Sequence, residues 1–198
     1  MCAIIGFDSP TLTEQEIRPY FDRTISRGPD MSRMEKAGRG MLGFHRLAIM
    51  GLHEEGMQPF HLGGDMAVCN GELYGFRPLK KELEAKGYTF ASESDCELIL
   101  PLYREYGVEM FAKLDAEVAM IIYDAKADRL VAARDPIGIR PLFYGYLADG
   151  GILFASEAKN LVGLCERIMP FPPGHYYADG KFVRYADLTT VTEYSKDD

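Results

Sequence analysis

The sequence lacks long hydrophobic runs and clusters of positive charge. No stretch approaches the roughly 20 apolar residues that a membrane-spanning helix requires. The 198 residues carry a formal net charge of -8, and no block of like charges interrupts the chain. Binding to the phosphates of a nucleic acid or to an anionic membrane surface requires a basic surface. We therefore expect neither a nucleic acid nor a membrane as a partner.

Cysteine and histidine are scarce. The four cysteines form no Cys-x-x-Cys pair, and no two of the four histidines stand three or four residues apart. Such spacings are typical of zinc sites, so we predict no metal site. Unpaired thiols are typical of a reducing compartment. The first residues also lack the positively charged segment of a secretory signal peptide. We therefore predict a cytoplasmic protein.

The composition is that of a globular domain, with 47% hydrophobic and 26% charged residues. A chain of this length can bury a substantial core without disulfides or metals. Residues 189–198 are polar and follow neither a helical nor a strand period. We therefore predict one domain over residues 1–188, followed by a tail or linker over residues 189–198.

Strand patterns dominate both ends of the chain, and helical patterns lie between them. This order predicts the α+β class with mostly antiparallel sheets. Apolar runs on both sides of the turn at 124–128 predict one hairpin, and turn residues at 149–150 and 179–180 predict two more. Strands are predicted at 2–7, 41–49, 65–71, 118–123 and 129–133, and helices at 14–24, 80–86 and 95–106.

Cys2 is the first candidate for chemistry. A residue this small permits removal of Met1, which leaves Cys2 at the N-terminus. The α-amine, whose ordinary pKa is about 8, can then accept the thiol proton and later return it to a leaving amine. Such a mechanism requires no histidine. The alternative is that Cys2 is only a small apolar residue that opens a strand.

A second candidate group follows the apolar residues 66–68. Asn70 supplies a side-chain N–H donor, and Gly71 allows a ligand to approach the backbone closely. Together they could form an oxyanion hole. Glu72 could accept hydrogen bonds from a substrate ammonium group. The alternative is that Asn70 and Gly71 are the turn of a hairpin.

Two further charged residues complete the set. Asp95 stands at a predicted helix start, where Ser94 or Asp95 could alternatively be an N-cap. Arg46 could bind a carboxylate in a bidentate manner, although it could also be a surface arginine. Together these residues match the needs of free glutamine. Arg46 could bind its α-carboxylate, and Glu72 with Asp95 could bind its α-ammonium group. Cys2 could attack its amide carbon, and Asn70 with Gly71 could donate to the oxyanion.

A series of short motifs carries a family resemblance over nearly the whole chain. The sequence resembles the N-terminal glutaminase domain of class II glutamine amidotransferases, and within that group the asparagine synthetases. The subgroup rests on residues 27–30, which read Arg-Gly-Pro-Asp, and on Cys96 after Asp95. The matching segments are 1–6, 27–30, 46–49, 58–60, 70–74, 94–97, 133–142, 154–157 and 172–175.

The resemblance implies an N-terminal nucleophile hydrolase fold, a four-layer αββα sandwich of two antiparallel sheets. It implies hydrolysis of L-glutamine to glutamate and ammonia through a γ-glutamyl thioester on Cys2. Asn70 and Gly71 would assist catalysis, and no cofactor would be needed in this domain. The substrate-binding residues would be Arg46, Leu47, Ile49, Glu72 and Asp95.

Three positions depart from the family pattern. Ser26 stands where many members have histidine, and Ala3 replaces the first glycine after the nucleophile. Near the carboxylate clamp the family often reads Gly-His-x-Arg, whereas here His45 lies directly before Arg46. None of the three is a residue assigned to the reaction, so we expect effects on rate or pocket shape only.

The resemblance also implies a partner. Asparagine synthetases continue into an ATP-pyrophosphatase domain with a Ser-Gly-Gly-x-Asp phosphate loop, which this sequence lacks. We expect such a synthetase domain in cis or in trans, and ATP and magnesium belong to it. The sequence specifies neither the ammonia acceptor nor whether the protein forms a homodimer. The alternatives are a glutaminase domain of another class II amidotransferase and a non-catalytic glutamine-binding module.

Overall fold

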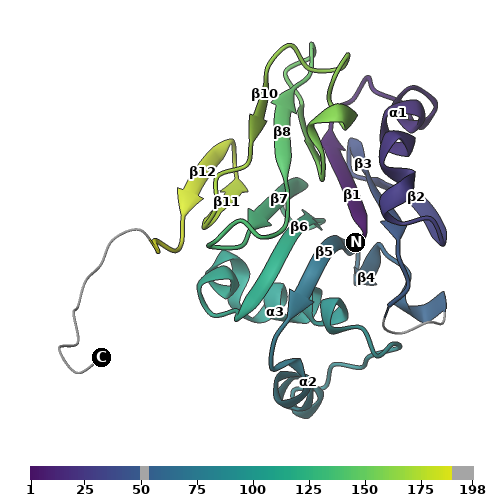
Figure 1. Cartoon of the computed structure of the whole chain (residues 1–198). Coiled ribbons are helices and arrows are strands. Elements are labelled where there is room, and N and C mark those ends of the chain that lie inside the picture. The colour runs from purple at the N-terminus through teal and green to yellow at the C-terminus, as the bar shows by residue number, and fades with distance from the viewer. Residues whose placement is uncertain (50–53, 189–198) are drawn as a thin grey trace, which may run out of the picture.

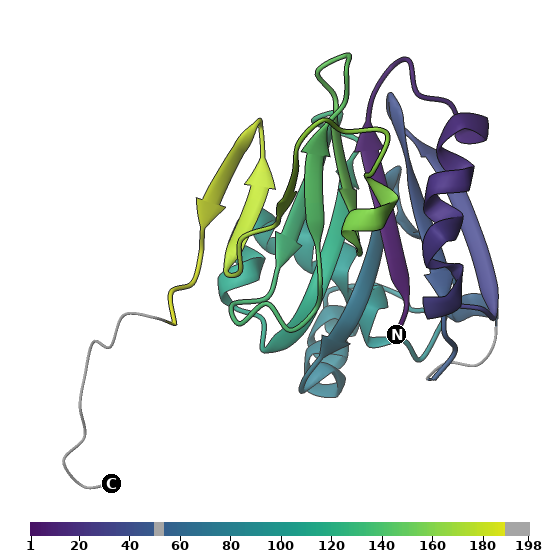
Figure 2. The ribbon, with the colours of Figure 1, turned by 45° about the horizontal axis from the view of Figure 1, so that its top comes forward.

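The computed structural model describes residues 1–49 and 54–188, and two antiparallel six-stranded sheets form its centre (Figures 1 and 2). The first sheet has the order β10-β8-β9-β1-β3-β2, and the second has the order β12-β11-β7-β6-β5-β4. The strands of the first sheet are β1 (Ala3–Asp8), β2 (Met31–Ala37), β3 (Gly40–Arg46), β8 (Phe143–Tyr146), β9 (Ile152–Ala155) and β10 (Ile168–Pro170). Those of the second are β4 (Phe60–Leu62), β5 (Asp65–Leu73), β6 (Ala116–Asp124), β7 (Arg129–Arg134), β11 (His175–Ala178) and β12 (Lys181–Arg184).

Helices cover the outer faces of both sheets. In Figure 1, α1 (Glu14–Phe21) lies beside the first sheet, whereas α2 (Phe76–Ala85) and α3 (Ile99–Tyr106) lie beside the second. None of the helices in the described part of the chain is both long and apolar enough to cross a bilayer. The shorter 3₁₀ helices are η1 (Asp22–Arg27), η2 (Glu54–Gly56), η3 (Asp95–Leu98), η4 (Gly107–Ala112) and η5 (Ala158–Asn160).

Three hydrophobic clusters separate the four layers. Along a strand, successive side chains point to opposite faces. Ile4 accordingly packs between the sheets, whereas its neighbour Ile5 packs with Ile17 of α1. On β6, Ile121 faces the other sheet and Ile122 packs in the cluster that includes the residues of α3. The predicted αββα sandwich is therefore confirmed.

The predicted start of α1 is confirmed, but its end is wrong. Thr13 and Glu16 form the expected capping box, in which the Thr13 backbone N–H donates to the Glu16 carboxylate at 2.9 Å. The α-helix ends at Phe21, and the chain continues as the 3₁₀ helix η1. At this point the Thr24 hydroxyl donates to the Phe21 carbonyl at 2.9 Å, a local bond that competes with regular helix geometry.

Other element boundaries differ from the predictions. The hairpins β6–β7, β8–β9 and β11–β12 are confirmed. However, α2 begins at Phe76 instead of residue 80, and the first turn of the helix predicted at 95–106 is 3₁₀. The edge strands β2, β4 and β10 were not predicted. The sequence of β2, MSRMEKA, has apolar residues at every third position, among them the buried Met34 and Ala37, so it lacks the apolar alternation of a half-buried strand.

The chain begins in the middle of a sheet. Strand β1 pairs with β3 on one side and with β9 on the other. Because β1 starts at Ala3, Cys2 lies directly at the entrance of this central strand. Figure 1 marks the N-terminus near β5 of the other sheet, which carries Asn70 and Gly71. The fold thus brings the two halves of the predicted site together.

Candidate active site

A pocket of about 290 Å³ lies at the N-terminus. It contains residues from the ends of β3 and β5 and from the start of η3. All eight residues that the sequence predicts for the site line it, so segments far apart in the sequence meet here. They are Cys2, Arg46, Leu47, Ile49, Asn70, Gly71, Glu72 and Asp95.

The Cys2 thiol is partly buried in this pocket. The Leu47 backbone N–H donates a hydrogen bond to the Cys2 sulfur, with an N–S distance of 3.3 Å. Burial raises the pKa of the thiol above its ordinary value. The Leu47 hydrogen bond, the N-terminal amine of Met1 and Arg46 act in the opposite direction on this pKa, because each stabilises the thiolate. Cys2 is therefore placed in the pocket with groups that favour its anionic form.

Arg27, which had no predicted role, holds the backbone of Cys2 and is itself held by Glu157. The Arg27 Nε donates to the Cys2 carbonyl at 3.0 Å, and a terminal nitrogen of the same guanidinium pairs with Glu157 at 2.9 Å. Both residues belong to motifs that the sequence comparison singled out, at 27–30 and 154–157. Membership of these motifs was the only sign in the sequence that the two residues matter, because a hydrogen bond to a backbone atom produces no recognisable sequence pattern.

The rest of the Arg-Gly-Pro-Asp motif fixes the segment after β3. A side chain at Gly28 would place its Cβ only 2.2 Å from the carbonyl oxygen of His45. Glycine therefore allows the two backbones to touch. Asp30 accepts a hydrogen bond from the Ala48 N–H at 2.8 Å, and its own N–H donates to the Arg46 carbonyl at 3.1 Å. The motif thus holds the segment that carries Arg46 and Leu47.

Arg46 is buried, with only 3% of its surface exposed. It lines the pocket, and one of its terminal nitrogens lies 3.7 Å from the Met31 sulfur. The alternative of a surface arginine is therefore wrong. A buried guanidinium in a pocket is well suited to bind a carboxylate, because its attraction is weakly screened.

His45 is not part of the pocket. Its ring is buried and stacks on Phe21 with a centroid distance of 3.6 Å, and Nδ1 lies 2.6 Å from the Ser32 hydroxyl. Burial lowers the pKa of His45 below its ordinary value. The histidine that departs from the family pattern therefore packs against α1 and does not replace a pocket residue.

Asn70 and Gly71 are strand residues, so their interpretation as a hairpin turn is wrong. Asn70 pairs with Ala119 and Gly71 with Val118, inside the β5–β6 ladder. A Cβ at Gly71 would lie 2.2 Å from the Glu117 carbonyl oxygen, which explains why this position requires glycine.

The side-chain nitrogen of Asn70 is buried and has no hydrogen-bond partner within residues 1–49 and 54–188. Buried donors are nearly always satisfied in folded proteins. An unsatisfied amide that lines the same pocket as the Cys2 thiol is therefore available to an oxygen of a ligand.

The two acidic residues occupy different environments. Glu72 is exposed and lies opposite Glu117 of β6. Asp95 is buried, and one of its carboxylate oxygens accepts the Leu73 N–H at 2.6 Å. Ser94 occupies the N-cap position of η3, as one alternative predicted, but its side chain makes no capping hydrogen bond. Asp95 instead connects the start of η3 to the end of β5, and both acids line the pocket.

Arg140 lines the pocket, although the sequence analysis gave it no role. It belongs to the loop after β7. Asp135 organises this loop by accepting backbone N–H groups from Gly138 at 2.6 Å and from Arg140 at 3.0 Å. The Arg140 guanidinium forms an ion pair with Glu117. The 133–142 motif therefore places a second cation at the pocket.

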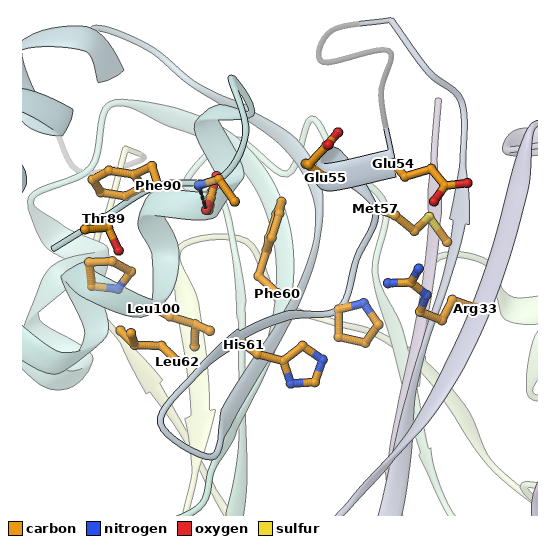
Figure 3. A pocket seen from close by; sticks show the side chains of 14 residues that line it. Arg33, Glu54, Glu55, Met57, Phe60, His61, Leu62, Thr89, Phe90 and Leu100 are labelled. Carbon is orange, nitrogen blue, oxygen red and sulfur yellow. Dashed lines mark hydrogen bonds between the residues drawn. The ribbon is translucent and has the colours of Figure 1, made fainter.

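Figure 3 shows a second hollow of about 280 Å³. Segment 54–62 separates the two: Gly56 and Gln58 line the first pocket, whereas Met57 and Phe60 line the second. None of the eight predicted site residues lines this second hollow. In the described ranges, no group of three or more histidine, cysteine or acidic side chains is placed to hold a metal ion.

Similar folds occur in solved structures. One structure, described as the allosteric regulatory enzyme of purine biosynthesis, aligns with a TM-score of 0.79 and 21% identity over 93% of this chain and 49% of that chain. The glutamine phosphoribosylpyrophosphate amidotransferase from B. subtilis, complexed with ADP and GMP, aligns with a TM-score of 0.75 and 20% identity over the same shares. At these identities the likeness concerns the fold.

The sequence matches the glutamine amidotransferase domain family over residues 1–177, and the chain therefore belongs to this family. A probable glutamine-hydrolysing asparagine synthetase from Dictyostelium discoideum is 43% identical, covering 93% of this chain and 35% of that protein. Asparagine synthetase 2 from Arabidopsis thaliana is 38% identical, covering 90% of this chain and 31% of that protein. The chain thus spans about a third of the length of these relatives.

Proposed function

We propose that this chain hydrolyses L-glutamine to glutamate and ammonia, with Cys2 as the nucleophile once Met1 has been removed. One observation carries this proposal. The pocket that holds the Cys2 thiol also holds the buried Asn70 amide nitrogen, which lacks a partner in the described part of the chain. A nucleophile and an unsatisfied donor in one pocket are the two requirements for attack on a carbonyl.

The charges of the pocket match the two ends of glutamine. Arg46 binds the α-carboxylate, while Glu72 and Asp95 accept hydrogen bonds from the α-ammonium group. Leu47 supplies a backbone donor to the Cys2 sulfur, and Ile49 lies at the rim with 74% of its surface exposed. This arrangement directs the side-chain amide of glutamine towards Cys2.

The reaction proceeds in two stages. The α-amine of Cys2 accepts the thiol proton, and the thiolate attacks the amide carbon. Asn70 and the adjacent Gly71 stabilise the negative charge that develops on the carbonyl oxygen. Collapse of the tetrahedral intermediate releases ammonia, which takes the proton, and leaves a γ-glutamyl thioester. Water then hydrolyses the thioester to glutamate and regenerates the thiol.

We further propose that the ammonia serves an ATP-dependent synthetase domain, in cis or in trans, as the names of the asparagine synthetase relatives suggest. Those relatives are about three times as long as the segment that they share with this chain. ATP and magnesium would act in that domain. The residues described here provide the glutaminase half, and the chain would form no asparagine by itself.

The Asn70→Ala variant tests the proposed site. Its donor is stronger in the transition state than in the ground state, so its loss should lower kcat for glutamine hydrolysis about 100- to 1000-fold while KM stays within a few-fold. Steady-state glutamate release measures both constants. Asn70→Asp, which keeps the shape and removes the donor, should show a comparable loss.

Thermal melting of both Asn70 variants and a Cys2→Ala variant provide the controls. Cys2→Ala should abolish turnover and still bind glutamine. A folded Asn70→Ala protein with wild-type kcat would remove Asn70 from the mechanism. Wild-type protein with a free Cys2 amine and no turnover would contradict the proposed function as a whole.

A further inference from the structure

The Gln58-Pro59-Phe60 motif has no part in the reaction described above. Nevertheless, Gln58 is 4% exposed and lines the pocket. Both ends of its side-chain amide bind the backbone of one residue, Cys69. The Gln58 Oε1 accepts the Cys69 N–H at 2.6 Å, and the Gln58 Nε2 donates to the Cys69 carbonyl at 3.2 Å.

The Gln58 side chain continues a strand ladder that Pro59 interrupts. Strand β4 pairs with β5 up to Phe60, which lies opposite Ala67. In this register Gln58 would face Cys69, but Pro59 has no N–H and disrupts the regular ladder. The side-chain amide of Gln58 supplies the acceptor and the donor that a strand backbone would have supplied. The outer edge of β5 is thereby held beyond the end of β4.

This support acts on the residue next to Asn70. The Asn70 amide nitrogen makes no hydrogen bond of its own within the described ranges, so the backbone of β5 sets its position. Strand β6 holds β5 on the inner side, where Asn70 lies opposite Ala119. Gln58 holds it on the outer side at Cys69. The oxyanion donor therefore projects from a backbone that is fixed on both edges.

We propose that Gln58 is a positioning residue that fixes the Asn70 donor through the backbone of Cys69. This inference rests on the proposed glutamine hydrolysis. A donor that shifts by about 1 Å can cost roughly 100-fold in rate. Gln58→Leu should therefore lower kcat about 100-fold and leave KM for glutamine within a few-fold, because the residues that bind the α-carboxylate and α-ammonium are untouched.

A conservative variant and a neighbouring control separate positioning from stability. Gln58→Glu keeps the oxygen that accepts the Cys69 N–H, so its kcat should exceed that of Gln58→Leu about tenfold or more. Met57→Ala changes the adjacent residue of the same segment, which lines the second hollow (Figure 3). It should lower Tm and leave kcat within about twofold. An equal loss of kcat in Met57→Ala would overturn the proposal.

The double variant gives the decisive measurement. If Gln58 acts through Asn70, adding Gln58→Leu to Asn70→Ala should lower kcat by less than about threefold further. Losses that multiply would show that Gln58 acts independently and would overturn the proposal. Should Gln58→Leu fail to fold, Gln58→Glu takes its place in the double variant.

An assay of the wild-type protein distinguishes failure of the proposed function from failure of the positioning role of Gln58. Wild-type protein that has a free Cys2 amine and does not hydrolyse glutamine contradicts the proposed function. Active wild type together with a folded, fully active Gln58→Leu protein contradicts only the positioning role.

Discussion

At the scale of single residues, the pocket pairs charges of both signs with a neutral thiol. Arg46 and Arg140 line it together with Glu72 and Asp95. Their charges suit a zwitterionic ligand, whereas an anion or a cation alone would leave part of the pocket unmatched. The binding groups can therefore be tested separately from the groups that act on the reacting amide.

Replacing Arg46 with alanine should weaken binding. The loss of a charge-assisted pair to the α-carboxylate, worth about 1.5–3 kcal/mol, should raise KM for glutamine roughly 10- to 100-fold with a smaller effect on kcat. Arg33→Ala removes a guanidinium from the second hollow instead and should leave KM unchanged. Initial rates over a range of glutamine concentrations measure both. Equal KM values for Arg46→Ala and wild type would exclude Arg46 from binding.

The activity should also depend on pH in a defined direction. Burial raises the pKa of the Cys2 thiol, so at neutral pH the protonated form predominates and the thiolate increases as pH rises. Because the α-amine of Cys2 is the proposed base, kcat/KM for glutamine should fall about tenfold per pH unit below the pKa of this amine, whose ordinary value is about 8. The rate of Cys2 alkylation by iodoacetamide should instead rise with the thiolate fraction. Activity that declines between about pH 7 and pH 9 in a protein that stays folded would contradict this.

Membership of the pocket was predictable where the side chain itself is proposed to act. Cys2, Arg46 and Asn70 were chosen for their chemistry, and the structure places all three in one pocket. Arg27 and Gln58 could not be identified in this way, because each binds the backbone of a residue that is distant in sequence. Only the folded chain reveals which carbonyl or N–H such a side chain meets.

At the scale of elements, β5 is the strand on which the site depends. Its sequence after Cys69 is polar, which ended the predicted strand at residue 71 and favoured a hairpin turn. In the structure the strand continues to Leu73, which pairs with Ala116. Pairing with β6 supplies hydrogen bonds that outweigh the weak strand propensity of asparagine and glycine. A single-sequence pattern does not contain this tertiary contribution.

Two glycine substitutions should distinguish the contribution of close packing to stability from the contribution of backbone conformation. Gly71→Ala would place a Cβ 2.2 Å from the Glu117 carbonyl, so we expect a loss of about 1–3 kcal/mol in the free energy of unfolding. Gly75 has a φ of 62° with open space around it, and Gly75→Ala should cost about 1 kcal/mol.

Denaturant unfolding and glutamine turnover measured together check this pair. Gly71→Ala should lose activity as well as stability, because the strand that carries Asn70 must shift. Gly75→Ala should keep kcat near the wild-type value. If Gly71→Ala were as stable and active as wild type, β5 and β6 would have to be further apart at this point than the structure shows.

At the scale of the whole molecule, the class was predictable from sequence patterns and the layers from the family resemblance, but the order of the strands was not. Apolar runs on both sides of a turn identified the hairpin β6–β7, and turn residues identified β11–β12, because the partners in each are adjacent in sequence. The pairing of β1 with β9 joins residues about 150 positions apart, such as Ile5 and Ala155. Local periodicity carries no information about such a pair.

The predicted domain boundary at residue 188 can be tested by truncation. A chain that ends at Leu188 should melt within about 2 °C of the full chain and keep its kcat, because the two sheets and the pocket lie within residues 1–188. A large drop in Tm would place residues 189–198, which lie outside the described ranges, in the domain. Differential scanning calorimetry and the glutamine assay provide the comparison.

The central position of β1 determines when its sheet can be completed during synthesis. The strand that follows Cys2 pairs with β9, which is made about 150 residues later. At 5–20 residues per second this interval lasts roughly 8–30 s. During it the segment around Cys2 belongs to an unfinished chain, so a processing enzyme can reach Met1 before the sheet closes. Synthesis thus provides an interval in which the proposed nucleophile can be exposed.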